Sequence, residues 1–83
     1  MKELEDAIKR YEAIARKNDD EFSFIIRIER SRRPNKPLGF CFDVVETCDG
    51  HSFSTGFGDS IELAVQDALS GLNDDLETWG YSE

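Results

Sequence analysis

The residue types that most often do chemistry are scarce in this chain, and they gather around one predicted turn. Cys48 and His51 flank the dipeptide Asp49-Gly50, which favours a two-residue type I′ hairpin turn. Such a turn would place Cys48 opposite His51. These two side chains, even with Asp49 as a third, are fewer than the four ligands of a structural zinc site, so we expect no metal.

Nucleophilic catalysis by Cys48, with His51 as its base, is the other interpretation of this turn. It would need a third group to orient His51 and a glycine-rich oxyanion loop, and the sequence offers neither. We therefore expect no enzymatic activity and no cofactor. Cys41 lies on the same predicted strand as Cys48, about 23 Å away at about 3.3 Å per residue, which is too far for a disulfide. Both thiols should be free.

Charge is distributed very unevenly along the 83 residues, whose net charge is −8. All ten lysines and arginines lie within residues 1–36, whereas residues 37–83 contain ten acids and neither of these bases. Net charge bears on solubility and association rather than on fold. Solvation of a small domain is one explanation of the surplus, and a basic partner is the other.

The acids of the last predicted helix are the candidate partner-binding residues. The end of this helix carries no base, although the partial negative charge of a helix C-terminus favours bases there. Selection for a basic protein partner explains that arrangement better than solvation does. The candidate residues are Asp59, Glu62, Asp67, Asp74, Asp75 and Glu77.

Four bases in the loop after the first predicted strand form a secondary candidate site. They are Arg30, Arg32, Arg33 and Lys36. Four bases would give a weak, salt-dependent and unspecific contact with phosphates. Because the rest of the chain is acidic, we expect no direct nucleic-acid binding, and we expect the loop to pair with the chain's own acids or with an acidic partner.

Hydrophobic periodicity predicts the order helix, three strands, helix. A helix over residues 3–17 has a stripe formed by Leu4, Ala7, Ile8, Tyr11, Ile14 and Ala15. Strands are predicted over residues 21–29, 38–45 and 52–57 from the alternation of apolar and polar residues. Asp59 is the expected N-cap of the last helix, with Glu62 at capping-box spacing. Its stripe is Ile61, Ala64, Val65, Ala68, Leu69, Leu72, Leu76 and Trp79, with a bend expected near Gly71 and an end at Gly80.

The hairpin turn fixes a register for the last two strands. It pairs Phe42 with Phe57 and Val44 with Thr55, which places all six phenylalanines on one face of the sheet. Both helices should cover that face, so the expected fold class is α+β, with a three-stranded antiparallel sheet and two helices packed on one side. Ile25, Cys41 and Val45 should form a small apolar patch on the other face, where a homodimer or a partner contact is an alternative to scattered exposure.

Length and hydropathy bear on the number of domains and on where the protein is located. Residues 1–83 are expected to form a single domain. The sequence has no apolar run near the roughly 20 residues that cross a bilayer, so we expect no membrane partner. The first residues are acidic where a secretory signal would be basic and then apolar, which predicts a cytoplasmic protein, in the host cytoplasm if the chain is phage-encoded.

The predicted order of elements, with Gly56-Phe57-Gly58-Asp59-Ser60 leading into Ala64 and Ala68, resembles the double-stranded-RNA-binding domain. That family enters its last helix through G-x-G-x-S, and it grips phosphates with a lysine-rich start to this helix. Ile61, Glu62 and Val65 stand at those positions here, so the resemblance implies the fold and not the RNA binding.

A shorter segment is similar to another family. Gly58-Asp59-Ser60-Ile61-Glu62-Leu63-Ala64, followed by Asp67-Ala68-Leu69, resembles the G-D-[ST]-L-E-E-A segment of HicB-type antitoxins. The Pro-Asp-Leu-Pro-Gly-Cys stretch that precedes this segment in the family is absent from the chain, and the added first helix is a departure.

In kind, the chain also resembles small acidic phage inhibitors such as anti-CRISPR and anti-restriction proteins, some of which act as nucleic-acid mimics. Our interpretation is a non-enzymatic inhibitor that blocks a basic nucleic-acid-binding surface of a larger protein complex. A HicB-like antitoxin that neutralises a small toxin and a degenerate double-stranded-RNA-binding-like domain are the two alternatives.

Overall fold

A computed structural model describes residues 2–18, 22–32 and 38–83 of the chain. Helix α1 (Lys2–Lys17) is followed by strands β1 (Phe24–Ser31), β2 (Gly39–Glu46) and β3 (Ser52–Gly58), and then by helices α2 (Ile61–Ser70) and α3 (Leu72–Trp79). The strands form one antiparallel sheet in the order β1-β2-β3. The chain is thus an α+β protein with the predicted order of elements, except that the last helix is divided in two.

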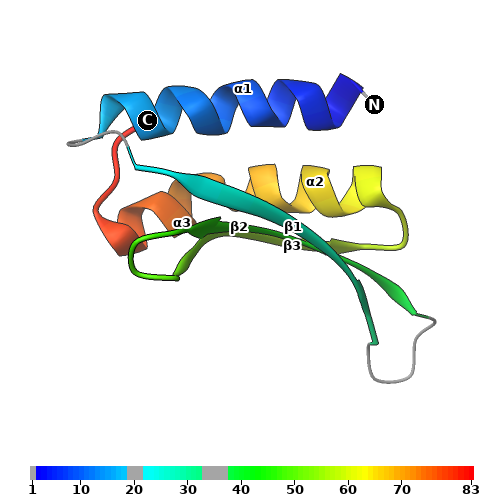
Figure 1. The fold of residues 1–83 in the computed structure, drawn as a ribbon. Helices are drawn as coiled ribbons and strands as arrows, with labels where there is room; N and C mark the ends of the chain where they lie inside the picture. The colour runs from blue at the N-terminus through cyan, green and yellow to red at the C-terminus, as the bar shows by residue number, and fades with distance from the viewer. Residues whose placement is uncertain (1, 19–21, 33–37) are drawn as a thin grey trace.

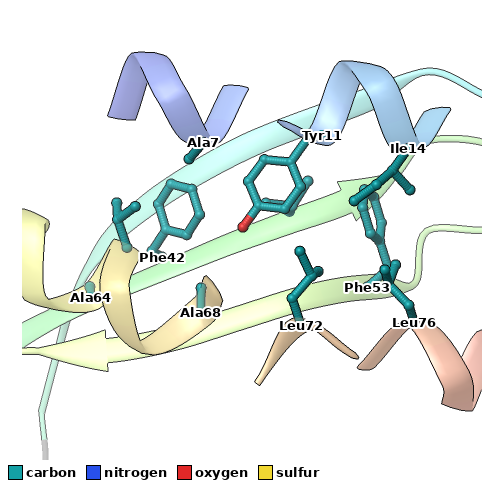
Figure 2. Packing of buried hydrophobic residues seen from close by; sticks show 11 residues of the cluster. Ala7, Tyr11, Ile14, Phe42, Phe53, Ala64, Ala68, Leu72 and Leu76 are labelled. Atoms are coloured by element: carbon teal, nitrogen blue, oxygen red, sulfur yellow. The ribbon is translucent and has the colours of Figure 1, made fainter. Parts of the chain in front are cut away.

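All three helices lie on one side of the sheet, and the C-terminus returns to the end of α1 (Figure 1). Between these layers lies the core, which Figure 2 shows from close by. It combines the buried stripe of α1, the inward side chains of the strands and the small residues of α2. The hydroxyl groups of Tyr11 and Ser54 form a buried hydrogen bond of 2.8 Å at its centre, which leaves neither group unsatisfied.

The predicted register of the last hairpin is wrong by one residue. Phe42 pairs with Gly56 instead of Phe57, and the register shifts again between Val44 and Val45, where β3 has an extra residue. The irregularity turns Phe53 into the core, whereas Phe57 lies on the open face with 49% of its surface exposed. Phe57 is therefore a correction to the expectation that all six phenylalanines share the helix side.

The turn between β2 and β3 is longer than the predicted two-residue turn. Val45 pairs with Ser52, and the amide of Glu46 donates to the carbonyl oxygen of His51 at 2.9 Å. The loop therefore spans residues 47–51, with Gly50 at a φ of +73° that favours glycine. Cys48 and His51 are therefore not a cross-strand pair. Both lie within this loop, which is organised by hydrogen bonds to the carboxylate of Glu46.

The last helix begins and divides at different points from those expected. Ser60, and not Asp59, is its N-cap, since the Ser60 hydroxyl accepts a hydrogen bond from the Leu63 amide at 3.1 Å. Gly71 separates α2 from α3 at the predicted bend, and Gly80 ends α3 in the left-handed conformation as expected. Trp79 is 44% exposed and is not part of the core stripe.

Helix α2 packs so closely on β3 that only glycine fits at the contact. A Cβ atom on Gly56 would lie 2.2 Å from the carbonyl oxygen of Ala64 and 2.3 Å from the amide nitrogen of Ala68. The glycine and the two alanines of the segment that resembles RNA-binding domains therefore have a direct packing role. They set the distance between the helix layer and the sheet.

We expect Gly56→Ala to lower the free energy of unfolding by about 3 kcal/mol, because the added methyl group meets helix backbone that cannot move aside. Gly71→Ala is the matched control, since its Cβ would lie 4.0 Å from the carbonyl oxygen of Asp67, at ordinary contact distance. It should change stability by less than about 1 kcal/mol. Urea denaturation followed by circular dichroism measures both variants, and equal losses would contradict the close contact.

Candidate functional site

Several acids of residues 37–83 are engaged by the chain itself. Asp43 accepts hydrogen bonds from Arg27 at 2.8 Å and from the Thr55 hydroxyl at 2.9 Å. Glu83 forms an ion pair with Arg10, which brings the C-terminal segment to α1. These two carboxylates are neutralised by bases from the first part of the chain, so they do not add to an acidic surface.

Asp67 also has a structural role. One of its carboxylate oxygens accepts a hydrogen bond from the amide of Phe57 at 2.9 Å. Strand β3 is an edge of the sheet, and this amide points away from β2, so the side chain of Asp67 satisfies a backbone donor that the sheet leaves free. Of the predicted partner-binding residues, Asp67 is thus committed to holding α2 against β3.

The exposed carboxylates of Glu62, Asp74 and Glu77 differ from these acids. Within residues 2–18, 22–32 and 38–83, no ion pair or hydrogen bond engages them. All three side chains belong to α2 and α3, which lie in the part of the chain that has no lysine or arginine. The structure therefore leaves these helices with unpaired negative charge on their solvent side.

The positions of some of these acids are explained by the helix ends, which the sequence did not reveal. Because the helix divides at Gly71, Asp74 and Asp75 lie in the first turn of α3, where acids interact favourably with the helix dipole. Glu62 has the same position in α2. Glu77 lies near the C-terminal end of α3, which has no base in its last turn. Only Glu77 thus has a position that the dipole disfavours.

The two remaining candidate partner-binding residues, Asp75 and Asp59, are less available to a partner. Asp75 is half-buried, and its charge contributes to raising the pKa of Tyr11, after the larger effect of burial on that tyrosine. Asp59 is exposed but has an interaction within the chain. The surface formed by Glu62, Asp74 and Glu77 is called the acidic helix surface below.

The loop between β2 and β3 brings together a different group from the one predicted. Ligand atoms of Glu46, Asp49 and His51 lie within 4.8 Å of one another, whereas Cys48 is not part of the group. Both carboxylate oxygens of Glu46 accept backbone hydrogen bonds, from the amides of Cys48 and Asp49, at 2.8 Å each. This carboxylate is nearly buried and closes the turn, which accounts for the group without a metal ion.

His51 is held by aromatic residues from the C-terminal part of the chain. Its ring stacks on Trp79 with the ring centroids 3.9 Å apart, and its Nε2 atom lies 2.8 Å from the hydroxyl oxygen of Tyr81. The indole of Trp79 donates to the carbonyl oxygen of Ser52 at 3.0 Å. These contacts fasten α3 to the β2–β3 loop, and they give His51 a packing role that its position in the sequence did not indicate.

The predicted basic site is described only in part. Arg30 places its guanidinium 4.2 Å from the ring centroid of Phe40 and donates to the carbonyl oxygen of Leu38 at 3.0 Å. Arg32 is exposed. Arg33 and Lys36 lie outside the described residues. The two described arginines flank the end of β1 and do not meet the acidic helix surface.

The open face of the sheet is partly apolar, as expected from Ile25, Cys41 and Val45. Phe57 joins these residues because of the register correction, and it lies opposite Cys41. Arg27, Asp43 and Thr55 form a hydrogen-bonded group in the middle of the face. Burial, followed by the nearby charge of Asp43, raises the pKa of the Cys41 thiol. The patch is therefore divided by a polar centre, and it is less continuous than the sequence suggested.

Comparison of the chain with protein-family models, with curated proteins and with solved structures finds no match. Both family resemblances drawn from the sequence therefore remain predictions. None of the helices among the described residues has the length and apolar character needed to cross a membrane.

The role of Asp67 can be separated from partner binding. We expect Asp67→Ala to lower the free energy of unfolding by about 1 kcal/mol, because the amide of Phe57 loses its acceptor. Asp67→Asn keeps an acceptor oxygen and should cost less. Urea denaturation compares the two, and an alanine variant as stable as the unmodified chain would show that this hydrogen bond contributes nothing.

The carboxylate of Glu46 makes stability depend on pH. Hydrogen bonds from the amides of Asp49 and Cys48 hold the pKa of Glu46 below its ordinary value of 4.5. The charged form is thus favoured by folding, so its contribution is complete above pH 4.5 and is lost as pH falls through the lower pKa of the folded state. We expect Glu46→Gln to be less stable than the unmodified chain at pH 7. Urea denaturation between pH 7 and pH 3 should show this difference shrinking only below pH 4.5; a constant difference would contradict it.

Proposed function

We propose that the chain is a non-enzymatic protein-binding domain that uses the acidic helix surface to occupy a basic, nucleic-acid-binding surface of a larger protein. It acts as an inhibitor, of the kind represented by anti-CRISPR and other phage anti-defence proteins. The carboxylates stand where the phosphates of a nucleic acid would bind, and the two compete for the same site.

One observation carries this proposal. The carboxylates of Asp43, Glu46, Asp67 and Glu83 all have partners within the chain, whereas those of Glu62, Asp74 and Glu77 have none among the described residues. These three acids belong to one continuous segment, from α2 to α3, which contains no lysine or arginine, whereas the acids of α1 without a described partner share their helix with five lysines and arginines. A carboxylate that is not needed for folding remains available for an external cation. The described acids that support folding and those that support binding are therefore different residues.

The rigidity of the surface also favours this function. Helix α2 is fixed on the sheet by the Gly56 contact, and α3 is fixed by the stacking of Trp79 on His51. Charges on ordered helices lose little conformational entropy when they meet a partner. Complementary charge speeds association more than it adds affinity, and it loses range as salt rises because the Debye length is about 8 Å at physiological ionic strength.

The alternatives have less support from the described residues. RNA-binding domains contact phosphates through lysines at the start of their last helix. At the corresponding positions here, Val65 is fully buried, and Ile61 and Glu62 reach the surface but are not basic. The arginine that could replace these lysines, Arg30, packs on Phe40. A HicB-like antitoxin remains a distinct outcome of the experiment below.

The test is charge reversal on the acidic helix surface. The variant Glu62→Lys/Asp74→Lys/Glu77→Lys should keep its circular dichroism spectrum and lose its partner in a pull-down from the native host read by mass spectrometry. The partner captured by the unmodified chain should be a nucleic-acid-binding protein, and added duplex DNA or RNA should release it, because the two compete for one surface.

The matched control reverses three exposed acids of α1 that have no described partner, as Glu3→Lys/Glu5→Lys/Asp6→Lys, which changes the net charge by the same amount. It should retain the partner. Equal capture by both variants would refute the acidic-surface mechanism. Capture of one small toxin that nucleic acid does not release would favour the antitoxin. A shift of duplex RNA by the chain at low salt, abolished by Arg32→Ala/Arg33→Ala, would favour the RNA-binding domain.

A further inference from the structure

The two edges of the sheet are treated differently by the rest of the chain. On the β3 edge, the amide of Phe57 donates to Asp67 and the carbonyl oxygen of Ser52 accepts from Trp79. Helices α2 and α3 thus occupy two of the free backbone groups of β3. Strand β1 forms the opposite edge, and it pairs only with β2.

The backbone groups that β1 presents to solvent follow from one hydrogen bond. The carbonyl oxygen of Ser23 accepts from the amide of Thr47 at 3.0 Å, so Ser23 points its backbone groups toward the β2 side. Because these directions alternate along a strand, the N–H and C=O groups of Phe24, Ile26, Ile28 and Arg30 point away from β2. Within the described residues, no side chain or backbone group bonds to them.

This edge has neither the proline nor the bulge that often prevents pairing with another strand, and the charged side chains that it carries, Arg27, Glu29 and Arg30, favour only a register that matches them. Strand β1 pairs with β2 over its eight residues, Phe24–Ser31, without a register shift, and it contains no proline. Arg27, Ile28, Glu29 and Arg30 are all exposed. A long and regular open edge is a template for another strand.

If two copies of the chain pair through their β1 strands, the charges along β1 favour one register. When two copies pair antiparallel about Ile28, Arg27 lies opposite the partner's Glu29, and Glu29 lies opposite the partner's Arg27. These would be non-hydrogen-bonded pairs, in which side chains approach most closely. Ile28, which is 39% exposed in the single chain, meets the partner's Ile28 at the two-fold axis. Each Ile26 lies opposite the partner's Arg30.

Neighbouring registers do not share this complementarity. Sliding one strand by two residues keeps the outward backbone groups in line, but it places Arg27 opposite the partner's Arg27 or Glu29 opposite the partner's Glu29. Like charges directly opposite each other are destabilising. Sliding by four residues toward the start of the strand removes both ion pairs. The arrangement centred on Ile28 is therefore favoured by backbone hydrogen bonds, by charge and by apolar contact together.

The distribution of charge over the whole chain is compatible with this contact. Two copies with a net charge of −8 repel each other, yet residues 24–31 contain two arginines and one glutamate. The acidic helix surface lies on α2 and α3, which pack on β3 and β2 and thus toward the opposite edge. The β1 edge is the part of the sheet where two copies meet with the least repulsion.

We propose that two copies of this chain associate through their β1 edges, in antiparallel register centred on Ile28, to form one continuous six-stranded sheet. The interface is isologous, as expected for a two-fold symmetric dimer. Its specificity comes from two symmetry-related pairs of Arg27 with the partner's Glu29. Arg27 already pairs with Glu29 of its own chain at 3.4 Å, so in the dimer the two arginines and two glutamates form one cluster across the axis. This contact is separate from the proposed inhibitor function, and either can fail without the other.

Sedimentation velocity over a range of concentrations tests the proposal on the full chain. We expect the mass to rise with concentration from the 9.5 kDa monomer toward twice that value. Amide hydrogen exchange, measured by NMR, should then show that Phe24, Ile26, Ile28 and Arg30 become protected as the dimer forms. A chain that stays monomeric up to millimolar concentration overturns the proposal. Dimerisation without protection of these amides also overturns it, and it would indicate an open-face dimer instead.

Two variants separate the edge contact from a folding defect. Ile28→Pro removes the N–H group of residue 28, which points away from β2. The hydrogen bonds between β1 and β2 are therefore kept, whereas the dimer loses the two backbone hydrogen bonds at its two-fold axis. Glu29→Arg places arginines opposite each other at both ion pairs. Each variant should keep its circular dichroism spectrum and weaken the dimer at least tenfold. Unchanged dimerisation of either folded variant overturns the proposal.

A charge swap supplies the rescue. Arg27→Glu places acids opposite each other and should also lose the homodimer, whereas an equimolar mixture of Arg27→Glu and Glu29→Arg chains should form a heterodimer, because both cross-strand pairs are then complementary. Phe57→Ser, on the open face, is the matched control and should dimerise like the unmodified chain. Loss of dimerisation in the folded control, or no heterodimer between folded variants, overturns the register.

Discussion

The close approach of α2 to β3 at Gly56 is the contact on which the rest of this structure depends. It requires a glycine in the strand and the small residues Ala64 and Ala68 in the helix, and it brings the helix backbone within direct contact of the sheet. Because the helix lies so near, the side chain of Asp67 reaches the amide of Phe57. One packing contact thus buries the stripe of α2 and also satisfies one backbone donor at the edge of β3.

The same contact determines which groups remain available. Helix α2 buries Val65 and Ala68 and therefore turns Glu62 toward solvent, since a helical stripe has one inner side. In the same way, α3 buries Leu72 and Leu76 and leaves Asp74 exposed. The division at Gly71 gives α3 its own first turn, where acids are favourable. Folding therefore explains where the carboxylates are, whereas it does not explain why no lysine or arginine accompanies them. The proposed function rests on that second fact.

Much of the architecture follows from local patterns in the sequence. The stripe from Ala7 to Ile14 predicts α1, alternation predicts the strands, and Gly71 and Gly80 mark the division and the end of the last helix. These signals depend on residues a few positions apart, which is why they can be read without the fold. The resulting α+β class, with all helices on one face, is confirmed.

What could not be predicted depends on contacts between distant residues. The carboxylate of Glu46 accepts hydrogen bonds from the amides of its own turn, and these bonds belong to a loop and a strand register that differ from the predicted ones. The extra residue in β3 then sends Phe53 into the core and Phe57 to the open face. Asp67 looked like any exposed helix acid, because its acceptor role arises only once β3 lies beside it. His51 looked like a candidate base, and only the position of Trp79 identifies it as a packing residue.

The asymmetry of the sheet joins the two proposals in one arrangement. Helices α2 and α3 bond to two backbone groups of the β3 edge and carry the acids, so the edge without such bonds among the described residues is the one in the half of the chain that contains the bases. In a dimer formed through β1, the two acidic helix surfaces would lie toward opposite ends of the six-stranded sheet. Neighbouring strands are about 4.8 Å apart, and in each copy β1 would separate the strands that carry α2 and α3 from the two-fold axis. Such a separation would reduce repulsion between the copies. Under the proposed function, the dimer would present two identical surfaces to neighbouring basic sites, at a higher effective concentration than one chain alone.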